Sequence, residues 1–219
     1  MRTDWNPPPA PEGGLSGGTG PLARLGYRTL RAIDPITGLG NAKCWLQRAA
    51  LMQCDAYWRH QPVALLAIDI DQFTRVNNEY GQPAGDDLLR SVGEVLRSAT
   101  YPGDLLCRGV ADEFLVLAPG RDVEAALELG TVIRDRVRLL VTEAMASVDW
   151  FVTIADVTVS VGIAVSTDLA ATDLLARARG ALEHVNGYGH DLICLADPAA
   201  AADHSLTRQG LSATTWQLG

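Results

Sequence analysis

An α/β domain, with helices packed on a central sheet, is the fold class that the sequence predicts. Apolar runs of strand length alternate along the chain with stretches that carry apolar residues at helical spacing. Hydrophobic residues make up 47% of the 219 residues, which is enough for a sizeable core. The alternating pattern covers residues 34–197, so we expect one domain over that range.

The first half of this region predicts a helix, a strand and a helix. Residues 41–60 carry apolar side chains near helical spacing. The run VALLAID (63–69) is continuously apolar and ends in an acid, which is typical of a buried strand. Residues 84–99 place their leucines and valines on one helical face.

The second half is predicted from the same signals. Two short apolar runs are separated by a turn and predict paired strands, and a long periodic stretch predicts a helix. A β-branched run follows, long enough for a strand pair or for one long strand. In order, the segments are the strands 104–109 and 113–119, the helix 122–145, the β-branched run 150–165, the helix 173–185 and the strand 191–196.

The two ends of the chain differ in composition from the domain. Residues 1–20 are rich in proline and glycine, so we expect them to be disordered. Residues 21–33 read as a short amphipathic helix that leads into the domain. Residues 198–219 are weakly patterned and are expected to form a flexible tail.

Charge and hydropathy exclude some classes of function. The net charge of −8 argues against broad nucleic-acid binding, which needs a basic face. No apolar run reaches the roughly 18–20 residues that span a bilayer, and the N-terminus lacks a signal peptide's apolar middle. We therefore expect a cytoplasmic protein without a membrane partner. The four scattered cysteines match no zinc motif and read as core residues.

Acidic residues gather at the ends of the predicted strands. Asp69 and Asp71 end the strand 63–69, and Asp112 and Glu113 lie in the turn between two later strands. If these strands pair, Asp69, Asp112 and Glu113 meet and repel one another unless a cation lies between them. Mg²⁺ bound together with a nucleotide would fit such a cluster. Solvated acids at strand ends are the alternative that these residues leave open.

Four motifs follow one another along the chain. DPITGLGN precedes a helix, DIDQFTRVNNEYGQPAGDDLL follows a strand, CRGVADEF forms a turn, and VTVSVGIAV comes later. Together they resemble the GGDEF domain of bacterial diguanylate cyclases, which shows D-x-L-T-G-L-x-N-R, D-x-D-x-F-K-x-x-N-D, G-H-x-x-G-D, R-x-G-G-D-E-F and T-V-S-x-G. The resemblance covers about residues 34–195, with the motifs in the right order.

The resemblance implies a palm-like fold of the nucleotide-cyclase type, with a mostly antiparallel sheet flanked by helices. It also implies a reaction in which two GTP molecules, one on each of two facing domains, condense to cyclic di-GMP and pyrophosphate. A homodimer and Mg²⁺ would belong to that reaction.

The resemblance assigns roles to individual residues. Asp69 matches a metal ligand, and Asp112 and Glu113 match the acidic signature positions, which implies metal-binding and catalytic roles. Asn77 and Asp86 match the pair that binds the guanine edge, where a carboxylate accepts from N1–H and the exocyclic amine. Phe73 matches the phenylalanine near the phosphates. For the further matches Asp34, Asn41 and Ser160, helix capping and turn formation are the simpler expectation.

The departures from the family pattern concern the phosphates and the signature turn. Thr74, Asn186 and His190 stand where the family has lysine, lysine and arginine that bind phosphate. Val110 and Ala111 replace the two signature glycines, so the turn either changes its geometry or fills nucleotide space.

The feedback site and the guanine motif also depart from the pattern. Tyr101 replaces the arginine of R-x-x-D in the family's product-inhibition site. High-affinity feedback binding of cyclic di-GMP is therefore not expected. Gln82 and Asn78 replace a histidine and an aspartate of the family motifs.

Three hypotheses follow. The favoured one is a degenerate, catalytically inactive GGDEF domain that acts as a guanine-nucleotide-binding or protein-interaction module and is read by a partner protein. The second is an active or weakly active diguanylate cyclase. The third is a pure protein-interaction module that binds no nucleotide.

Overall fold

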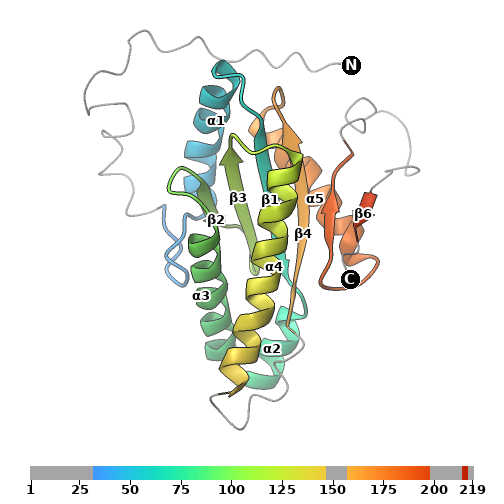
Figure 1. Ribbon diagram of the computed structural model, residues 1–219. Helices are drawn as coiled ribbons and strands as arrows, with labels where there is room; N and C mark the ends of the chain where they lie inside the picture. The colour runs from blue at the N-terminus through green and yellow to red at the C-terminus, as the bar shows by residue number, and fades with distance from the viewer. Residues whose placement is uncertain (1–31, 147–156, 198–213, 217–219) are drawn as a thin grey trace.

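The fold is a central sheet flanked by helices (Figure 1). The computed structural model describes residues 32–146, 157–197 and 214–216. The sheet has the strand order β2-β3-β1-β4-β5-β6. Its strands are β1 (Val63–Ile70), β2 (Leu105–Arg108), β3 (Glu113–Pro119), β4 (Val159–Ser166), β5 (Ile193–Leu195) and β6 (Thr214–Trp216). Only the β4–β5 pair is parallel among these strands, so the predicted mostly antiparallel sheet is confirmed.

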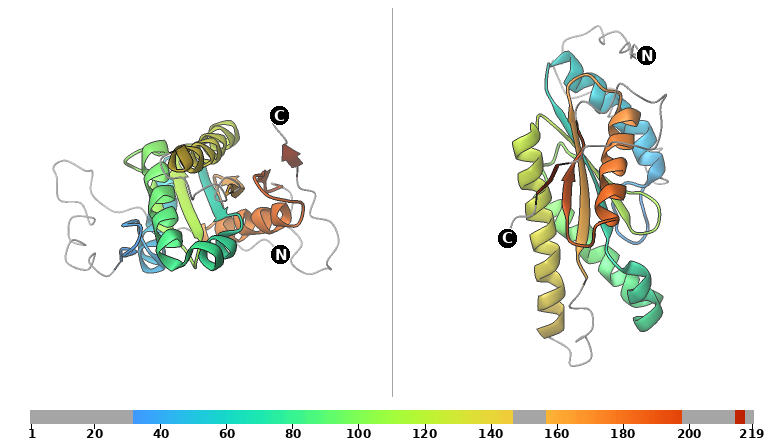
Figure 2. Two further views of the ribbon diagram at one scale, coloured as in Figure 1. Left: turned by 90° about the horizontal axis from the view of Figure 1, so that it is seen from below. Right: turned by 90° about the vertical axis from the view of Figure 1, so that its right-hand side faces the viewer.

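Helices cover both faces of the sheet, as the view along its edge shows (Figure 2, right). They are α1 (Ala42–Trp58), α2 (Phe73–Tyr80), α3 (Gln82–Ala99), α4 (Val123–Ala146) and α5 (Ala171–Asn186). One face buries Leu66 and Ile68 of β1 in a core with α3 and α4, and the other buries Leu65 and Ala67 in a core with α1 and α5. This burial on both faces explains why β1 is a continuous apolar run rather than an alternating one.

Helix α5 packs unusually closely on β4, and Gly162 allows it. A Cβ added at Gly162 would lie 2.1 Å from the carbonyl oxygen of Ala178 and 2.4 Å from the backbone nitrogen of Leu182. No side chain fits in that space. The glycine of VTVSVG is therefore a packing requirement that brings the outer residues of α5 close to the strand ends.

Several sequence expectations change in detail. The sequence pattern did not predict helix α2, a short helix between β1 and α3. Of the expected lead-in helix 21–33, the described residues Ala32 and Ile33 are not helical, and Ile33 forms a β-bridge with Gly40. The β-branched run yields the single strand β4, and residues 150–156 lie outside the described residues.

The C-terminal tail is also partly different from the expectation. The flexible tail expected over 198–219 is interrupted by β6, which pairs antiparallel with β5. The other tail residues, like residues 1–20, lie outside the described part of the chain. Among the described residues, no helix is both long and apolar enough to cross a membrane.

The turn between β2 and β3 keeps a geometry that normally calls for glycine. The Gly109 N–H donates to the Glu113 carbonyl at 2.7 Å, and the Glu113 N–H donates to the Val110 carbonyl at 3.0 Å. Ala111 has φ +57°, in the left-handed region, whereas Val110 does not have a positive φ. The Val110 side chain is 76% exposed. Of the two glycine replacements, only Ala111 carries backbone strain.

We therefore expect Ala111→Gly to stabilise the protein. The left-handed conformation costs an alanine about 1–2 kcal/mol, and glycine's greater freedom in the unfolded chain offsets roughly 0.5–1 kcal/mol of the gain. Chemical denaturation should show the free energy of unfolding rising by about 0.5–1 kcal/mol. Val110→Gly is the matched control and should lower it or leave it unchanged. A loss of stability in Ala111→Gly equal to that in Val110→Gly would contradict the strained turn.

Candidate functional site

Strand pairing brings the predicted acids together. In the antiparallel pair β1–β3, Asp69 lies directly opposite Glu113, and Asp112 immediately precedes β3. Residues opposite each other on neighbouring strands project to the same face of a sheet. The pairing on which the predicted acidic cluster depended is therefore present, and it concentrates negative charge at this end of the sheet.

The electrostatics of Asp69 reflect this crowding. The pKa of Asp69 is raised from 3.8 to about 6, first by burial and then by the charges of Asp112, Asp71 and Glu113. A hydrogen bond with the Asn186 side chain acts in the opposite direction. The pKa of Asp112 is also raised, mainly by burial, while the Arg108 charge opposes the rise. The carboxylates of the site thus carry more negative charge than the neighbouring polar and cationic groups neutralise.

Glu113 is different, because an arginine already holds it. Arg179 of α5 donates from Nε to Oε1 and from Nη2 to Oε2 of Glu113, both at 2.6 Å. The Glu113 side chain is only 14% exposed. The hydrogen bond with Glu113 raises the pKa of Arg179. Both oxygens of this carboxylate are therefore engaged by a parallel, two-bond contact, the strongest arrangement available to such a pair.

These contacts decide how well the acids fit a metal ion. Within the described ranges, no group of three or more histidine, cysteine, aspartate or glutamate side chains is arranged to hold one. Asp69 and Asp112 fit a divalent cation, since they are mutually repelling oxygen ligands. Glu113 does not fit while Arg179 holds it. Asp69 and Asp112 are therefore the two carboxylates that would hold a cation here.

Two of the residues matched to the nucleotide site, Asn77 and Phe73, lie close to Gly85 where α2 meets α3. A Cβ added at Gly85 would lie 2.0 Å from Asn77 Oδ1 and 3.2 Å from Phe73 Cζ. Asp86 follows Gly85 directly on α3. Asn77 Oδ1 is buried and accepts no hydrogen bond from the described residues. A buried acceptor without a donor is costly, and this one packs against the backbone of Gly85.

Two of the residues that replace phosphate-binding cations contact acids instead. Asn186 bonds to Asp69, as described above, and His190 Nδ1 lies 3.4 Å from Asp71 Oδ1. Thr74, the third, is exposed on the first turn of α2. At these three positions the chain thus offers no fixed positive charge to a phosphate.

Asp71 has a structural role that its spacing from Asp69 did not reveal. It is 3% exposed and accepts hydrogen bonds from Thr158 Oγ1 at 2.6 Å, from Ser160 Oγ at 2.8 Å and from the Asp191 N–H at 2.8 Å. It therefore fastens β4 and the segment after α5 to the end of β1. Ser160 is structural, as expected.

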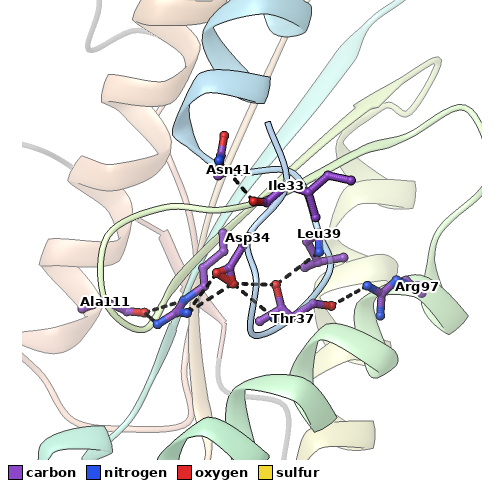
Figure 3. A network of polar contacts seen from close by, with 8 residues as sticks. Ile33, Asp34, Thr37, Leu39, Asn41, Arg97 and Ala111 are labelled. Carbon is purple, nitrogen blue, oxygen red and sulfur yellow. Dashed lines mark hydrogen bonds and ion pairs between the residues drawn. The ribbon is translucent and has the colours of Figure 1, made fainter. Parts of the chain in front are cut away.

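A second polar network links the turn at residues 34–41 to the signature turn (Figure 3). Arg108 Nη1 lies 3.2 Å from both oxygens of Asp34, and Arg108 Nε donates to the Ala111 carbonyl at 2.7 Å. Asp34 also accepts from the Thr37 backbone and hydroxyl. Asn41 caps α1 by accepting from the N–H groups of Lys43 and Cys44. Asp34 and Asn41 are thus turn and cap residues, as expected.

The segment that matches the family's feedback site also makes a local contact. Asp104, the remaining acid of YPGD, forms an ion pair with Arg121 at 3.0 Å. The Arg121 guanidinium lies 4.5 Å from the centre of the Tyr101 ring. This aspartate is therefore already paired within the chain, which agrees with the absence of the family's arginine.

Sequence reasoning missed two residues of the site, Arg108 and Arg179. Arg108 is the arginine of the R-x-G-G-D-E-F pattern, so the motif itself could have marked it. Arg179 lies inside α5 and belongs to none of the quoted motifs. Only the packing of α5 across the sheet brings it to Glu113.

Comparisons with known proteins agree with this geometry. A family model described as "Diguanylate cyclase, GGDEF domain" matches residues 31–191. The probable diguanylate cyclase DgcT of Escherichia coli K12 is 27% identical over 166 residues, which are 75% of this chain and 35% of that protein. The chain therefore spans about a third of the length of this relative.

Solved structures match the fold. The coiled coil and GGDEF domain of DgcB from Caulobacter crescentus, in complex with c-di-GMP, aligns with a TM-score of 0.68 at 22% identity, over 80% of this chain and 91% of that one. The diguanylate cyclase SiaD of Pseudomonas aeruginosa, in complex with its activator SiaC, aligns with a TM-score of 0.66 at 26% identity, over 80% and 66%. With its predicted fold and its family profile in agreement, this chain belongs to the GGDEF domain family.

Proposed function

We propose that this chain is a catalytically inactive GGDEF domain that binds a guanine nucleotide and acts as a regulatory module in cyclic di-GMP signalling. One observation carries the proposal. The guanine corner retains an unpartnered buried acceptor, whereas the residues that would hold the phosphates have become neutral or contact acids. The site thus keeps residues that would bind the base and lacks those that would act on the phosphates.

The guanine corner supports selective binding. Guanine presents N1–H and an exocyclic amine on one edge, and the Asp86 carboxylate can accept from both. Asn77 Oδ1 would gain the donor that it lacks among the described residues. An unmet buried acceptor costs about 1–3 kcal/mol, so a nucleotide that donates to Asn77 Oδ1 would recover part of that free energy.

The residues at the phosphate-binding positions argue against turnover of GTP. A hydrogen bond to a charged group contributes about 1.5–3 kcal/mol, so two or three missing cations remove roughly 3–9 kcal/mol. At about 1.4 kcal/mol per tenfold, that is a loss of orders of magnitude in triphosphate binding or turnover. The loss concerns Thr74, Asn186 and His190 together.

The remaining acids define what a metal would do here. Asp69 and Asp112 would hold Mg²⁺, which when bound would neutralise charge on phosphate oxygens. In the protein itself, Arg108 fixes the turn that carries Asp112 through the Ala111 carbonyl. Asn77 and Asp86 orient the base. These residues would position a nucleotide. At positions 74, 186 and 190, however, no lysine or arginine is present to stabilise the charge of a leaving phosphate group.

A domain that binds a nucleotide without converting it exerts its effect through a protein that binds the domain. SiaD was solved in complex with an activator protein. A protein that contains a related domain therefore binds a protein partner. We propose the same kind of partner here, with a second copy of this chain as the other arrangement that the family suggests.

An active or weakly active diguanylate cyclase is the alternative, and one observation favours it. Ala111 retains the left-handed backbone of the signature turn, so the turn has not collapsed into another shape. Asp69 and Asp112 also remain available to a cation. Formation of cyclic di-GMP decides between the two functions.

Calorimetric titration with GTP and Mg²⁺ tests the proposal. We expect binding to the unmodified protein, at least about tenfold weaker binding to Asp86→Ala, and no cyclic di-GMP when the same samples are analysed by chromatography. Asp87→Ala is the matched control, because Asp87 is the next residue, is exposed and pairs with Arg90. Equal losses in the two variants would contradict a guanine corner, and ready product formation would contradict inactivity.

The raised pKa of Asp69 gives a prediction for stability against pH. Its folded pKa of about 6 lies above the ordinary 3.8, so the folded protein binds this proton more tightly than the unfolded chain. The stability from this proton is fully present below the unfolded value and is lost as the pH rises through about 6. Above that pH, the charged carboxylate opposes folding by about 1 kcal/mol after solvent screening.

Thermal melts at about pH 5 and about pH 7.5 measure this effect. Asp69→Asn should melt higher than the unmodified protein at the upper pH and should lose less stability between the two. Mg²⁺ should raise the melting temperature of the unmodified protein at the upper pH and leave Asp69→Asn nearly unchanged. Asp87→Asn serves as an exposed control. If Asp69→Asn showed the same pH profile and the same Mg²⁺ response as the unmodified protein, Asp69 would not be the group responsible.

A further inference from the structure

The contact between Arg179 and Glu113 differs from an ordinary surface ion pair. Arg179 meets both carboxylate oxygens at 2.6 Å, and Glu113 is largely buried. A Cβ added at Gly109 would lie 2.2 Å from Glu113 Oε2, so the backbone across the turn encloses the same carboxylate. The Glu113 side chain is thus held from two sides, with a guanidinium as its charge partner.

Helix α5 is fixed in the position that this contact requires. Its backbone packs against Gly162 of β4 too closely for any side chain at that position. Asn186 lies seven residues after Arg179, which places the two on nearly the same face of the helix. Asn186 reaches Asp69 while Arg179 reaches Glu113. One face of α5 therefore supplies a polar partner to each of two neighbouring acids.

The guanidinium meets the same electrostatic need that a divalent cation would meet. Asp69 and Asp112 lack an arginine hydrogen bond among the described residues, and their pKa values are raised. Glu113 is neutralised without any ion. An arginine offers five N–H donors, of which this contact uses two, and its side chain is 46% exposed. The donors that this contact does not use are available to an anionic ligand.

We propose that Arg179 takes the place of a divalent cation at Glu113, so that the site accepts one metal ion, on Asp69 and Asp112, and presents a guanidinium to phosphate beside it. The inference rests on the proposed nucleotide site but concerns the metal-binding step alone. Arg179 is then the residue that sets how many divalent cations the site holds.

Mn²⁺ titration without nucleotide, followed by electron paramagnetic resonance, tests the proposal. Arg179→Met should free Glu113 as an oxygen ligand and raise the affinity for Mn²⁺ by about tenfold, the equivalent of about 1.4 kcal/mol. The unmodified chain should bind at most one ion, more weakly than Arg179→Met. The gain should disappear in the double variant Arg179→Met with Glu113→Gln, because the gain acts through that carboxylate.

The controls separate this effect from charge and from folding. Arg59→Met removes the same charge from an exposed pair with Asp55 on α1 and should leave Mn²⁺ affinity unchanged. Circular dichroism establishes that each variant is folded, and Arg179→Gln replaces Arg179→Met if that variant is not. Unchanged affinity in the folded Arg179 variant, or a gain that persists in the double variant, overturns the proposal. Because no nucleotide is present, failure of GTP binding leaves this result intact.

Discussion

Repulsion between carboxylates at the end of β1 and β3 is the constraint on which the rest of the site depends. Burial, and after it the charges of Asp112, Asp71 and Glu113, raise the pKa of Asp69 to about 6. Burial strengthens this repulsion, because the low local dielectric screens the charges poorly. The fold must therefore supply a compensating group for each acid, and the groups it supplies determine what the site can bind.

The compensating groups come from elements that are distant along the chain. Thr158, Ser160 and the backbone of Asp191 satisfy Asp71, and Arg179 of α5 satisfies Glu113. Arg108 opposes the rise in the pKa of Asp112, and Asn186 does the same for Asp69. Asp69 and Asp112 still have raised pKa values after these contacts. The remaining charge is thus concentrated on these two residues.

The same contacts underlie our proposal that this site binds the base but does not act on the phosphates. Asn186 and His190, at positions that the family resemblance assigns to phosphate-binding cations, contact acids of the protein. A neutral amide that bonds to Asp69 offers no charge to a triphosphate. The corner formed by Asn77, Gly85 and Asp86 lies on α2 and α3, whereas Asn186 ends α5 and His190 follows it. The buried acceptor of this corner remains unpartnered by the described residues.

Sequence patterns predicted most of the sheet and its helices because the core alternates in a regular way. The continuous run of β1 and the hairpin 104–119 follow directly from burial on both sheet faces. The approach of Asp69 to Glu113 followed from the pairing of those strands. The short helix α2 and the three-residue strand β6 carry too few periodic residues to be recognised.

Other features depend on tertiary packing and could not be read from local patterns. Arg179 has the appearance of a solvated helix residue until α5 is placed over β4. The replaced glycines left open whether the turn changes its geometry, and only the backbone assigns the left-handed conformation to Ala111. The role of Asp71 was hidden because its partners lie about 90 residues further along the chain or beyond.

The most direct test of this account is a structure of the chain soaked with a GTP analogue and Mg²⁺. We predict the guanine edge between Asn77 and Asp86, one metal ion on Asp69 and Asp112, and Arg179 still bonded to Glu113. A nucleotide held with two metal ions and with Glu113 released from Arg179 would contradict it. So would a nucleotide whose base lies outside the corner of α2 and α3.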